Sequence, residues 1–341
     1  LVEDMPSAFR QRFAITHYFN PVRYMRLLEL VRGSETTSDV IDRLADFNDR
    51  VLGKGVVRCA DTPGFLGNRV GVFALQVGID ETLKCNLAIE DADALFGRPM
   101  GIPKTGVFGL YDLIGIDLMA DVVVSLGNIL PADDAFHAVG AANPAIAAMI
   151  AAGFTGNKGK GGFYCLDGTK RMARQFAGYE GNDMPPLNHA KTKLPAAAIA
   201  AAEAAARQDE PLFMLLDGHD DQARFCRRVL GRILHYAASL VPSVTTTPQD
   251  IDDAMKLGFN WQRGPFEMID AIGQQRFAAL LDECGLTVPA FLEDGAPNYS
   301  VQAGSLMVRH ADGARQPVNL PEGVMRFHMT RRTLHPILTN D

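Results

Sequence analysis

The sequence lacks the features that mark secreted, membrane-embedded or nucleic-acid-binding proteins. Its five cysteines are odd in number and widely spaced, with no C-x-x-C pair, which predicts reduced thiols in a cytoplasmic protein and no metal site. No uncharged apolar run reaches about 18 residues and no signal peptide is visible, so no membrane span is expected. A net charge of −7 argues against nucleic acid as a partner.

A dinucleotide-binding turn is also missing ahead of the first clear strand. Such a turn has the pattern G-x-G-x-x-G, and the 16 residues before His17 do not contain it. The chain begins with Leu1 and not with Met, so we expect a fragment of a longer protein. The glycine-rich run 153–162 does not have the G-x-x-x-x-G-K spacing of a phosphate-binding loop and follows no buried strand. We interpret it as a flexible loop.

What remains has the composition of a globular protein. A length of 341 residues, with 47% hydrophobic and 21% charged residues, predicts two or three domains. Residues 13–19 are rich in β-branched and aromatic side chains, 27–32 are almost entirely apolar, and 56–59 form another short run, so we expect three strands. Helical spacing of apolar residues predicts a helix over 38–52. This order is typical of the closing part of an α/β sheet.

Helical patterns dominate the rest of the chain. The longest covers 67–87, and 222–241 has the same character. Helices are also expected in the Ala-rich segments 131–155 and 194–206. The strand-like run 305–308 fits either a connection to a further domain or an extension packed on the helices. The expected fold class is therefore mainly α with a partial α/β piece.

An internal repeat connects the two halves of this helical region. Residues 106–115 align without gaps on 264–273, at an offset of 158 (264 − 106). Upstream, Asp91-Ala92-Asp93 aligns on Asp250-Ile251-Asp252, at an offset of 159 (250 − 91). We therefore expect two copies of one helical domain.

One stretch of the sequence carries chemistry. His17 is a polar residue at the end of the first strand, and Glu29 lies alone inside the apolar second strand. Because a buried carboxylate is costly unless it is paired, we expect the intervening turn to bring His17 alongside Glu29. A His oriented by a buried carboxylate has the chemistry of a general base, although such pairs also occur as purely structural ones. The pattern alone leaves both interpretations open.

Two longer strings carry a resemblance to a known family. They are His17-Tyr18-Phe19-Asn20-Pro21, continued by Met25, Leu27, Glu29 and Gly33, and Asp61-Thr62-Pro63-Gly64-Phe65-Leu66-Gly67-Asn68-Arg69. Together they resemble the signature of the L-3-hydroxyacyl-CoA dehydrogenases, over most of residues 11–290. The resemblance implies that His17 is the catalytic base, that Glu29 fixes its tautomer and that Asn68 positions the substrate. Without it, Asn68 fits an ordinary capping amide.

The resemblance also implies how the chain is organised. At an offset of 159 the place of Asn68 is taken by Arg227, so we expect the second copy to serve as scaffolding. The chain resembles the C-terminal part of a larger, multifunctional member of the fatty-acid-oxidation type, truncated within the NAD-binding domain. The expected units are the end of a Rossmann-like NAD-binding domain over 1–60, a first helical dehydrogenase domain over 61–180, a linker and helix over 181–210, a second, degenerate helical domain over 211–295, and a C-terminal extension or connector over 296–341.

The implied activity is the NAD-dependent oxidation of an L-3-hydroxyacyl-CoA to the 3-ketoacyl-CoA. The resemblance implies acyl-CoA as the substrate and an enoyl-CoA hydratase domain in the same parent chain as the partner. It also implies that the protein is a monomer or a homodimer. The family's pyrophosphate turn and a Ser about 20 residues before the His fall ahead of Leu1, so no NAD-binding residue is identified and the chain alone is expected to be inactive. Two alternatives are a non-catalytic helical assembly module and a related dehydrogenase acting on another hydroxy acid.

Overall fold

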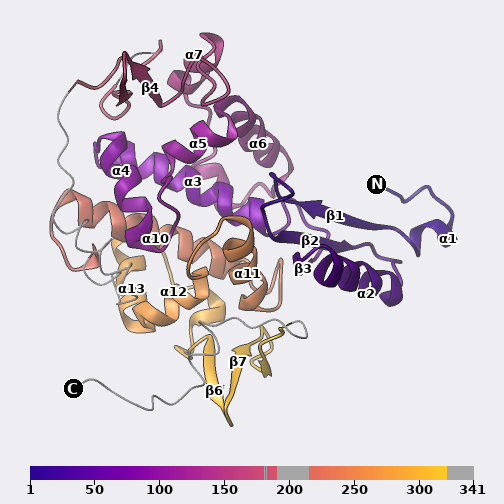
Figure 1. The fold of residues 1–341 in the computed structure, drawn as a ribbon. Coiled ribbons are helices and arrows are strands. Elements are labelled where there is room, and N and C mark those ends of the chain that lie inside the picture. The colour runs from indigo at the N-terminus through magenta and orange to yellow at the C-terminus, as the bar shows by residue number, and fades with distance from the viewer. Residues whose placement is uncertain (180, 182, 190–214, 321–341) are drawn as a thin grey trace.

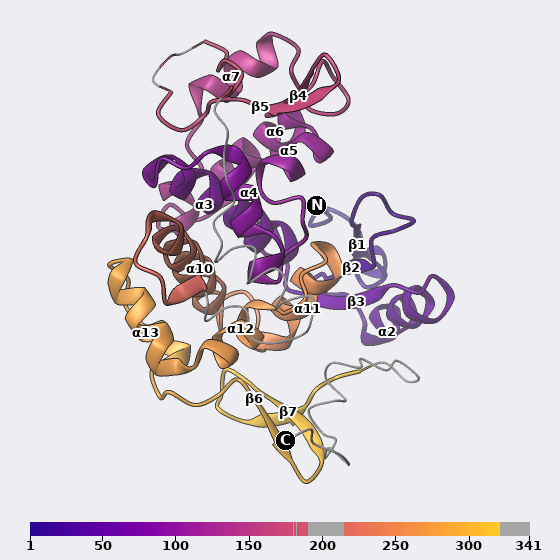
Figure 2. The same cartoon turned by 60° about the vertical axis from the view of Figure 1, so that its left-hand side comes forward.

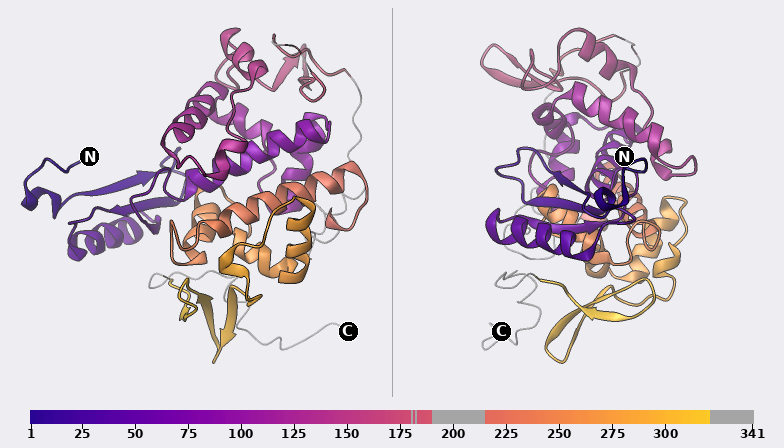
Figure 3. Two further views of the ribbon diagram at one scale, coloured as in Figure 1. Left: turned by 180° about the vertical axis from the view of Figure 1, so that it is seen from behind. Right: turned by 90° about the vertical axis from the view of Figure 1, so that its right-hand side faces the viewer.

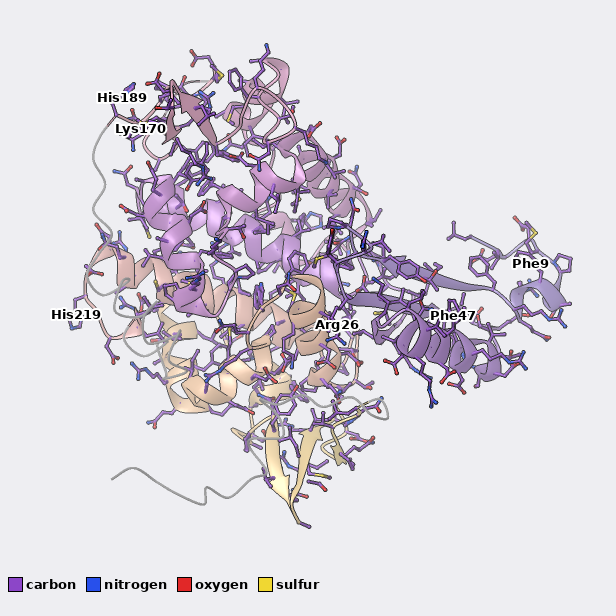
Figure 4. The ribbon with its side chains drawn as sticks, viewed as in Figure 1. Phe9, Arg26, Phe47, Lys170, His189 and His219 are labelled. Carbon is purple, nitrogen blue, oxygen red and sulfur yellow. The ribbon has the colours of Figure 1, made fainter. Side chains whose placement is uncertain are left out.

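A small α/β piece projects from a larger helical body (Figure 1, Figure 3). The computed structural model describes residues 1–179, 181, 183–189 and 215–320, so the helix expected over 194–206 lies outside the described residues. Arg26 lies where the sheet meets the helical body, whereas Phe9 and Phe47 lie on the projecting part (Figure 4). The expected fold class, mainly α with a partial α/β piece, is confirmed.

The projecting piece is built on a three-stranded sheet. Its strands are β1 (Ala14–Tyr18), β2 (Leu27–Arg32) and β3 (Gly55–Cys59), with β2 in the centre. β1 is antiparallel to β2, and β2 is parallel to β3. The residues of β2 from Leu27 to Val31 are all buried, which explains why its sequence is almost entirely apolar. The three strands expected from the sequence are confirmed.

Two short helices and a lysine complete this piece. α1 (Ser7–Arg10) precedes the sheet, and α2 (Ser38–Asp46) connects β2 to β3. The helix expected over 38–52 is α2 continued by a π-helical turn over Phe47–Val51. The buried Lys54 donates from Nζ to the carbonyl of Met25 at 2.8 Å and to that of Val22, which fixes the connection between β1 and β2.

The first helical copy is organised around α3 (Gly67–Lys84), which is buried along most of its length. It is followed by α4 (Ile89–Phe96), α5 (Phe108–Ile114), α6 (Ile116–Ile129) and α7 (Pro144–Ala151), with short 3₁₀ turns over Arg98–Met100 and Ala135–Ala138, and by a hairpin of β4 (Tyr164–Asp167) and β5 (Lys170–Ala173). The long helix expected over 67–87 is confirmed.

Two segments of this copy match their expectations in part. The Ala-rich segment 131–155 is helical only in the 3₁₀ turn and α7. α7 begins where Asn143 accepts the N–H of Ala145 at 2.9 Å, with Pro144 in the first helical position. The glycine-rich run 153–162 is a loop made of turns, as expected, and its flexibility stays a prediction. The Asn157 N–H donates to the backbone carbonyl of Asp112 at 2.8 Å, and this ties the turn to α5.

The second helical copy repeats this order. It contains α10 (Asp221–Ser239), α11 (Pro248–Gly258), α12 (Pro265–Ile272) and α13 (Gln274–Glu283), then a 3₁₀ turn over Ala290–Leu292 and a sheet of β6 (Tyr299–Gln302), β7 (Ser305–Arg309) and β8 (Arg315–Pro317). The strands β4 and β6 lie at opposite ends of the helical body (Figure 1). Of the two interpretations of the tail, its described part fits an extension packed on the helices.

Each copy contains a buried aspartate at the equivalent position, and it bonds to the start of a helix. Asp93 accepts hydrogen bonds from the N–H groups at the start of α5, at 2.7 to 2.9 Å, and Asp252 accepts those at the start of α12, at 2.8 and 3.2 Å. The hydroxyl of Tyr164 donates to Asp93 at 2.9 Å, and that of Tyr299 donates to Asp252 at 2.7 Å. These aspartates are the aligned residues of the repeat, so the repeat in sequence is a repeat of buried contacts.

The copies pack on each other through the antiparallel helices α3 and α10. Near the end of α3 the fully buried Glu81 accepts from Arg228 at 2.6 Å and from Arg232 at 2.5 Å, both near the start of α10. Near the start of α3 the ring of Phe73 stacks on Tyr236 with centroids 3.9 Å apart. The second copy therefore covers, within one chain, a face of α3 that would otherwise be exposed.

Candidate active site

His17 and Glu29 lie directly opposite each other in the register of β1 and β2. The Nδ1 atom of His17 is 2.7 Å from Oε2 of Glu29, the distance of a charge-assisted hydrogen bond. Glu29 is fully buried, whereas 33% of the His17 side chain is exposed. Among the described residues none bonds to Nε2, the other ring nitrogen. The pairing expected from the sequence is present, and the catalytic roles of the two residues stay a prediction.

The second carboxylate oxygen of Glu29 is held by the N-terminus of α3. Oε1 accepts the N–H groups of Leu66 at 2.9 Å and of Gly67 at 2.7 Å. Free N–H groups at the start of a helix carry partial positive charge, so a carboxylate oxygen is a favourable partner for them. With both oxygens engaged, Glu29 fixes the His17 tautomer that carries its proton on Nδ1 and leaves Nε2 as an acceptor.

Sequence reasoning missed these two backbone donors. A usable signal was present, because the capping residue of α3 is Leu66, which has no side-chain oxygen with which to cap the helix. A long helix that begins without a Ser, Thr, Asp or Asn leaves its first N–H groups for a partner elsewhere in the chain. Here that partner is the buried Glu29 of a neighbouring strand.

Aromatic rings enclose the imidazole of His17. Its centroid lies 5.1 Å from that of Phe19, at an interplanar angle of 63°, and 5.8 Å from that of Phe65. Phe65 has a φ of 47°, which is rare for a residue with a bulky side chain. The loop between β3 and α3 thus holds an unfavourable backbone conformation at the position that brings this ring to His17.

Asn68 is the second residue of α3 and is half-buried. Among the described residues its side-chain amide has no hydrogen-bond partner, so it is not a cap for its own helix. The next residue, Arg69, by contrast, is buried and bonds to Asp134 and, at 3.2 Å, to the hydroxyl of Tyr236. Asn68 therefore stands one residue from the N–H groups that hold Glu29, with its amide free to meet a ligand.

The donor set tests what this site can hold. Oγ1 of Thr62, in the loop between β3 and α3, is buried and lacks a hydrogen-bond partner among the described residues, as expected where a ligand supplies one. The residues before β1 contain no pyrophosphate-binding turn. The described residues thus fit the reacting end of a ligand but not the phosphates of a dinucleotide.

Other features lie away from this site or are lacking. One cavity of about 430 Å³ is lined by Arg174 and His189, and another of about 540 Å³ lies between α2 and the second copy. Within the described part of the chain, no cluster of three or more His, Cys, Asp or Glu is placed to hold a metal ion. Over the same residues, no helix is both long and apolar enough to cross a membrane.

Comparisons with known proteins agree on one family. The model of the 3-hydroxyacyl-CoA dehydrogenase NAD-binding domain matches residues 2–62. The model of the 3-hydroxyacyl-CoA dehydrogenase C-terminal domain matches 64–165 and again 225–317, so both helical copies belong to one domain type.

Two curated relatives and one solved structure illustrate the similarity. The chain is 36% identical over 287 residues to a protein of Rickettsia felis that carries the provisional name fatty acid oxidation complex trifunctional enzyme, covering 84% of this chain and 38% of that protein. It is 32% identical over 296 residues to a probable 3-hydroxyacyl-CoA dehydrogenase of Bacillus subtilis, covering 86% and 36%. The crystal structure of 3-hydroxybutyryl-CoA dehydrogenase from Escherichia coli shares the fold, with a TM-score of 0.57 and 20% identity, over 80% of this chain and 66% of that one.

The coverage of these relatives is one-sided. The chain spans 38% and 36% of the length of the two curated relatives, although they cover most of the chain. The C-terminal-domain model alone accounts for more than half of the residues, through two ranges that coincide with the two helical copies. On this evidence the chain belongs to the 3-hydroxyacyl-CoA dehydrogenase family.

Proposed function

We propose that the junction of the small sheet and α3 is the acid–base half of an active site that oxidises L-3-hydroxyacyl-CoA to 3-ketoacyl-CoA with NAD. One observation carries the proposal. A 33% exposed His17 is held at 2.7 Å by a fully buried Glu29, whose other oxygen accepts two N–H groups from α3. A fully buried carboxylate needs partners for both oxygens in a structural pair as well. The base is favoured because His17 is partly exposed and its Nε2 bonds to none of the described residues, so that nitrogen can accept a proton from a ligand.

In this proposal Nε2 of His17 takes the proton of the C3 hydroxyl as the C3 hydrogen leaves with its bonding electrons. NAD, when bound, supplies the acceptor for that hydride. Proton removal of this kind contributes about 10²–10⁴-fold to the rate. Glu29, held by the N–H groups of Leu66 and Gly67, stabilises the imidazolium that forms. The reverse direction returns the same proton from Nε2 to the ketone oxygen.

Two further side chains are proposed to contact the ligands. The amide of Asn68, which has no partner among the described residues, positions the substrate oxygen beside His17. The buried hydroxyl of Thr62 lacks a partner among the same residues, and we propose that it forms a hydrogen bond with a bound ligand. Both lie at the start of α3 or in the loop before it, next to the N–H groups that hold Glu29.

For the protein to which these residues belong we propose a fatty-acid-oxidation enzyme with acyl-CoA as substrate. The name of the Rickettsia felis relative supports an enoyl-CoA hydratase domain in the same chain. Five free cysteines support a cytoplasmic location. Because residues 1–62 contain no G-x-G-x-x-G, we propose that the 341 residues alone do not turn over.

The domain boundaries are proposed as 1–60, 61–180, 181–210, 211–295 and 296–341, with one refinement. Tyr299 donates to Asp252 as Tyr164 donates to Asp93, so the second helical unit reaches at least to β6. This favours a second unit that includes the sheet of β6 to β8 over a boundary at residue 295.

The first experiment is NADH oxidation with acetoacetyl-CoA, measured on this chain and on a longer protein that supplies the rest of the NAD-binding domain. We expect turnover only from the longer protein. Turnover of the short chain at a similar rate would contradict the need for the missing turn. If neither protein reacts with acetoacetyl-CoA, and the longer one reduces or oxidises another hydroxy-acid pair, the substrate class is wrong; if it reacts with none, the helical-assembly alternative takes over.

A further inference from the structure

The start of α3 presents two glycines, one turn apart, on a single face. A Cβ on Gly67 would overlap the ring of Phe19, and a Cβ on Gly71 would overlap the ring of Phe259. Phe19 follows β1, whereas Phe259 comes from the second helical copy. The lack of side chains at both positions lets the two rings settle against the helix backbone, directly beside the N–H groups that hold Glu29.

Phe259 has a fixed position in the second copy. It is the capping residue after α11, its N–H bonds to the carbonyl of Met255 at 3.0 Å, and Asn260 then ends the helix with a φ of 55°. The preceding Gly258 is also close to Phe19, because a Cβ there would touch both that ring and Leu27. α11 lies beside the strands of the small sheet (Figure 1, Figure 2) and contacts β2 and β3.

The rings form a continuous path to the imidazole. The centroids of Phe259 and Phe19 are 5.8 Å apart at 72°, and those of Phe19 and His17 are 5.1 Å apart at 63°. Both are edge-to-face arrangements, which are favourable and directional. The covalent link through Cβ and the hydrogen bond to Glu29 restrict the His17 ring, and packing against Phe19 and Phe65 limits the motion that remains. Phe19 can limit it only if Phe19 itself is held.

We propose that Phe259 of the second helical copy is a positioning residue for His17, acting through Phe19. The second copy, which carries Arg227 where the first has Asn68, thereby completes the site of the first. The relevance to catalysis rests on the proposed function, but the effect on the orientation of His17 does not. Loss of the Phe259 ring frees Phe19, and the Nδ1–H of His17 then exchanges with water more readily.

The test follows the Nδ1–H proton of His17 by NMR in this chain, with Phe259→Ala, Phe259→Tyr and Phe277→Ala. Phe277 is the matched control, since it is a buried ring of the second copy on α13, away from the small sheet (Figure 1). The hydrogen-bonded proton gives a downfield signal that disappears on His17→Gln. We expect its exchange with water to rise about tenfold in Phe259→Ala, to return to normal in Phe259→Tyr, and to stay unchanged in Phe277→Ala, because only the first loosens the ring path.

A second pair of variants keeps the test valid if Phe259→Ala does not fold. Gly71→Ala displaces the Phe259 ring without removing it, whereas Gly127→Ala, on α6, adds a methyl group into open space. We expect the Nδ1–H of His17 to exchange with water faster in Gly71→Ala and at the unchanged rate in Gly127→Ala. Unchanged exchange in a folded Phe259→Ala or Gly71→Ala protein overturns the proposal, as does an equal rise in Phe277→Ala.

The outcome is separable from that of the proposed function. If the longer protein oxidises NADH with acetoacetyl-CoA, Phe259→Ala is expected to lower its kcat about tenfold with little change in KM, because misplacement of the base affects the chemical step. If the longer protein shows no turnover, the NMR comparison still decides whether the second copy orients His17. A change in KM alone would contradict the positioning role.

Discussion

The two helical copies differ most at the start of their long helices. In the first copy, the N-terminus of α3 gives its N–H groups to Glu29 from the neighbouring sheet. In the second copy, α10 is capped by its own Asp220, which accepts the Ala223 N–H at 2.7 Å. Arg227, in the place of Asn68, closes the same region by donating to the backbone carbonyls of Leu216 and Gly218 and to the carboxylate of Glu283 at 2.6 Å.

This difference separates contacts that both copies share from contacts that belong to the proposed site alone. The Asp93–Tyr164 and Asp252–Tyr299 pairs are the same in both copies, so they belong to the architecture. The first N–H groups of α3 bond to the buried Glu29 of the neighbouring sheet. At the start of α10 the adjacent Asp220 takes that role. Among the described residues, the second copy therefore repeats the fold but not the contacts of the proposed site.

The largest effect is expected from replacing Glu29, the carboxylate that bonds to the start of α3 in the first copy. Glu29→Gln keeps an oxygen for the N–H groups of α3 but removes the charge beside His17. We expect kcat of the longer protein to fall about 10⁴-fold, by analogy with loss of the carboxylate in a triad. Steady-state kinetics measures this. Glu81→Gln, at another fully buried glutamate, is the control and should change kcat less than about threefold, because the ion pairs of Glu81 join it to Arg228 and Arg232 of α10 and not to His17.

A smaller effect is expected when the first copy receives the residue of the second. Asn68→Arg places a cation where an amide faces the proposed ligands, and we expect kcat/KM to fall about 10²-fold, the loss typical of one polar contact to the reacting oxygen. The melting temperature should change little, because the Asn68 amide has no partner among the described residues. An active Asn68→Arg enzyme would remove Asn68 from the proposed site.

The shared architecture predicts similar losses of stability in the two copies. Asp93→Asn and Asp252→Asn each place an NH₂ group against N–H donors, and each is expected to cost about 2 kcal/mol at pH 5. Thermal unfolding followed by circular dichroism compares them. A loss confined to one copy would show that the two networks are not equivalent.

The pH dependence of that loss has a definite sign. Burial raises the pKa of Asp93 from 3.8 to about 7, against the opposing effect of its hydrogen bonds. The stability it contributes is therefore fully present below about pH 4 and is lost as the pH rises through 7. Because Asn does not titrate, the cost of Asp93→Asn should be larger at pH 4 than at pH 8. A cost that grows with pH would contradict this.

The smallest effect is expected at the helix start of the second copy. Arg227→Asn removes the bonds to Leu216, Gly218 and Glu283, but Asp220 still caps α10. We expect a loss of about 1 kcal/mol in stability, in the range of a partly exposed charged hydrogen bond, and no change in kcat. Urea unfolding of the purified variant measures it. A change in kcat would mean that this position also affects the first site.

The sequence predicted the parts of the site that depend on neighbours along the chain. A lone Glu29 in an apolar strand required a partner, and the short connection to β1 left His17 as that partner. It could not predict that Leu66 and Gly67 complete the carboxylate or that Phe259 reaches Phe19, because these contacts join segments whose spatial order depends on how the helices pack. The break at Asn143-Pro144 was readable as a helix start, and high Ala content concealed it.

The antiparallel contact of α3 and α10 has a consequence for how the molecule responds to dilution. Since both helices belong to one chain, the effective concentration of one copy around the other is set by the connecting residues and not by the amount of protein in solution. Dilution cannot separate the pair held by Glu81, Arg228 and Arg232. A site that needs both copies therefore keeps its full complement of residues at any protein concentration.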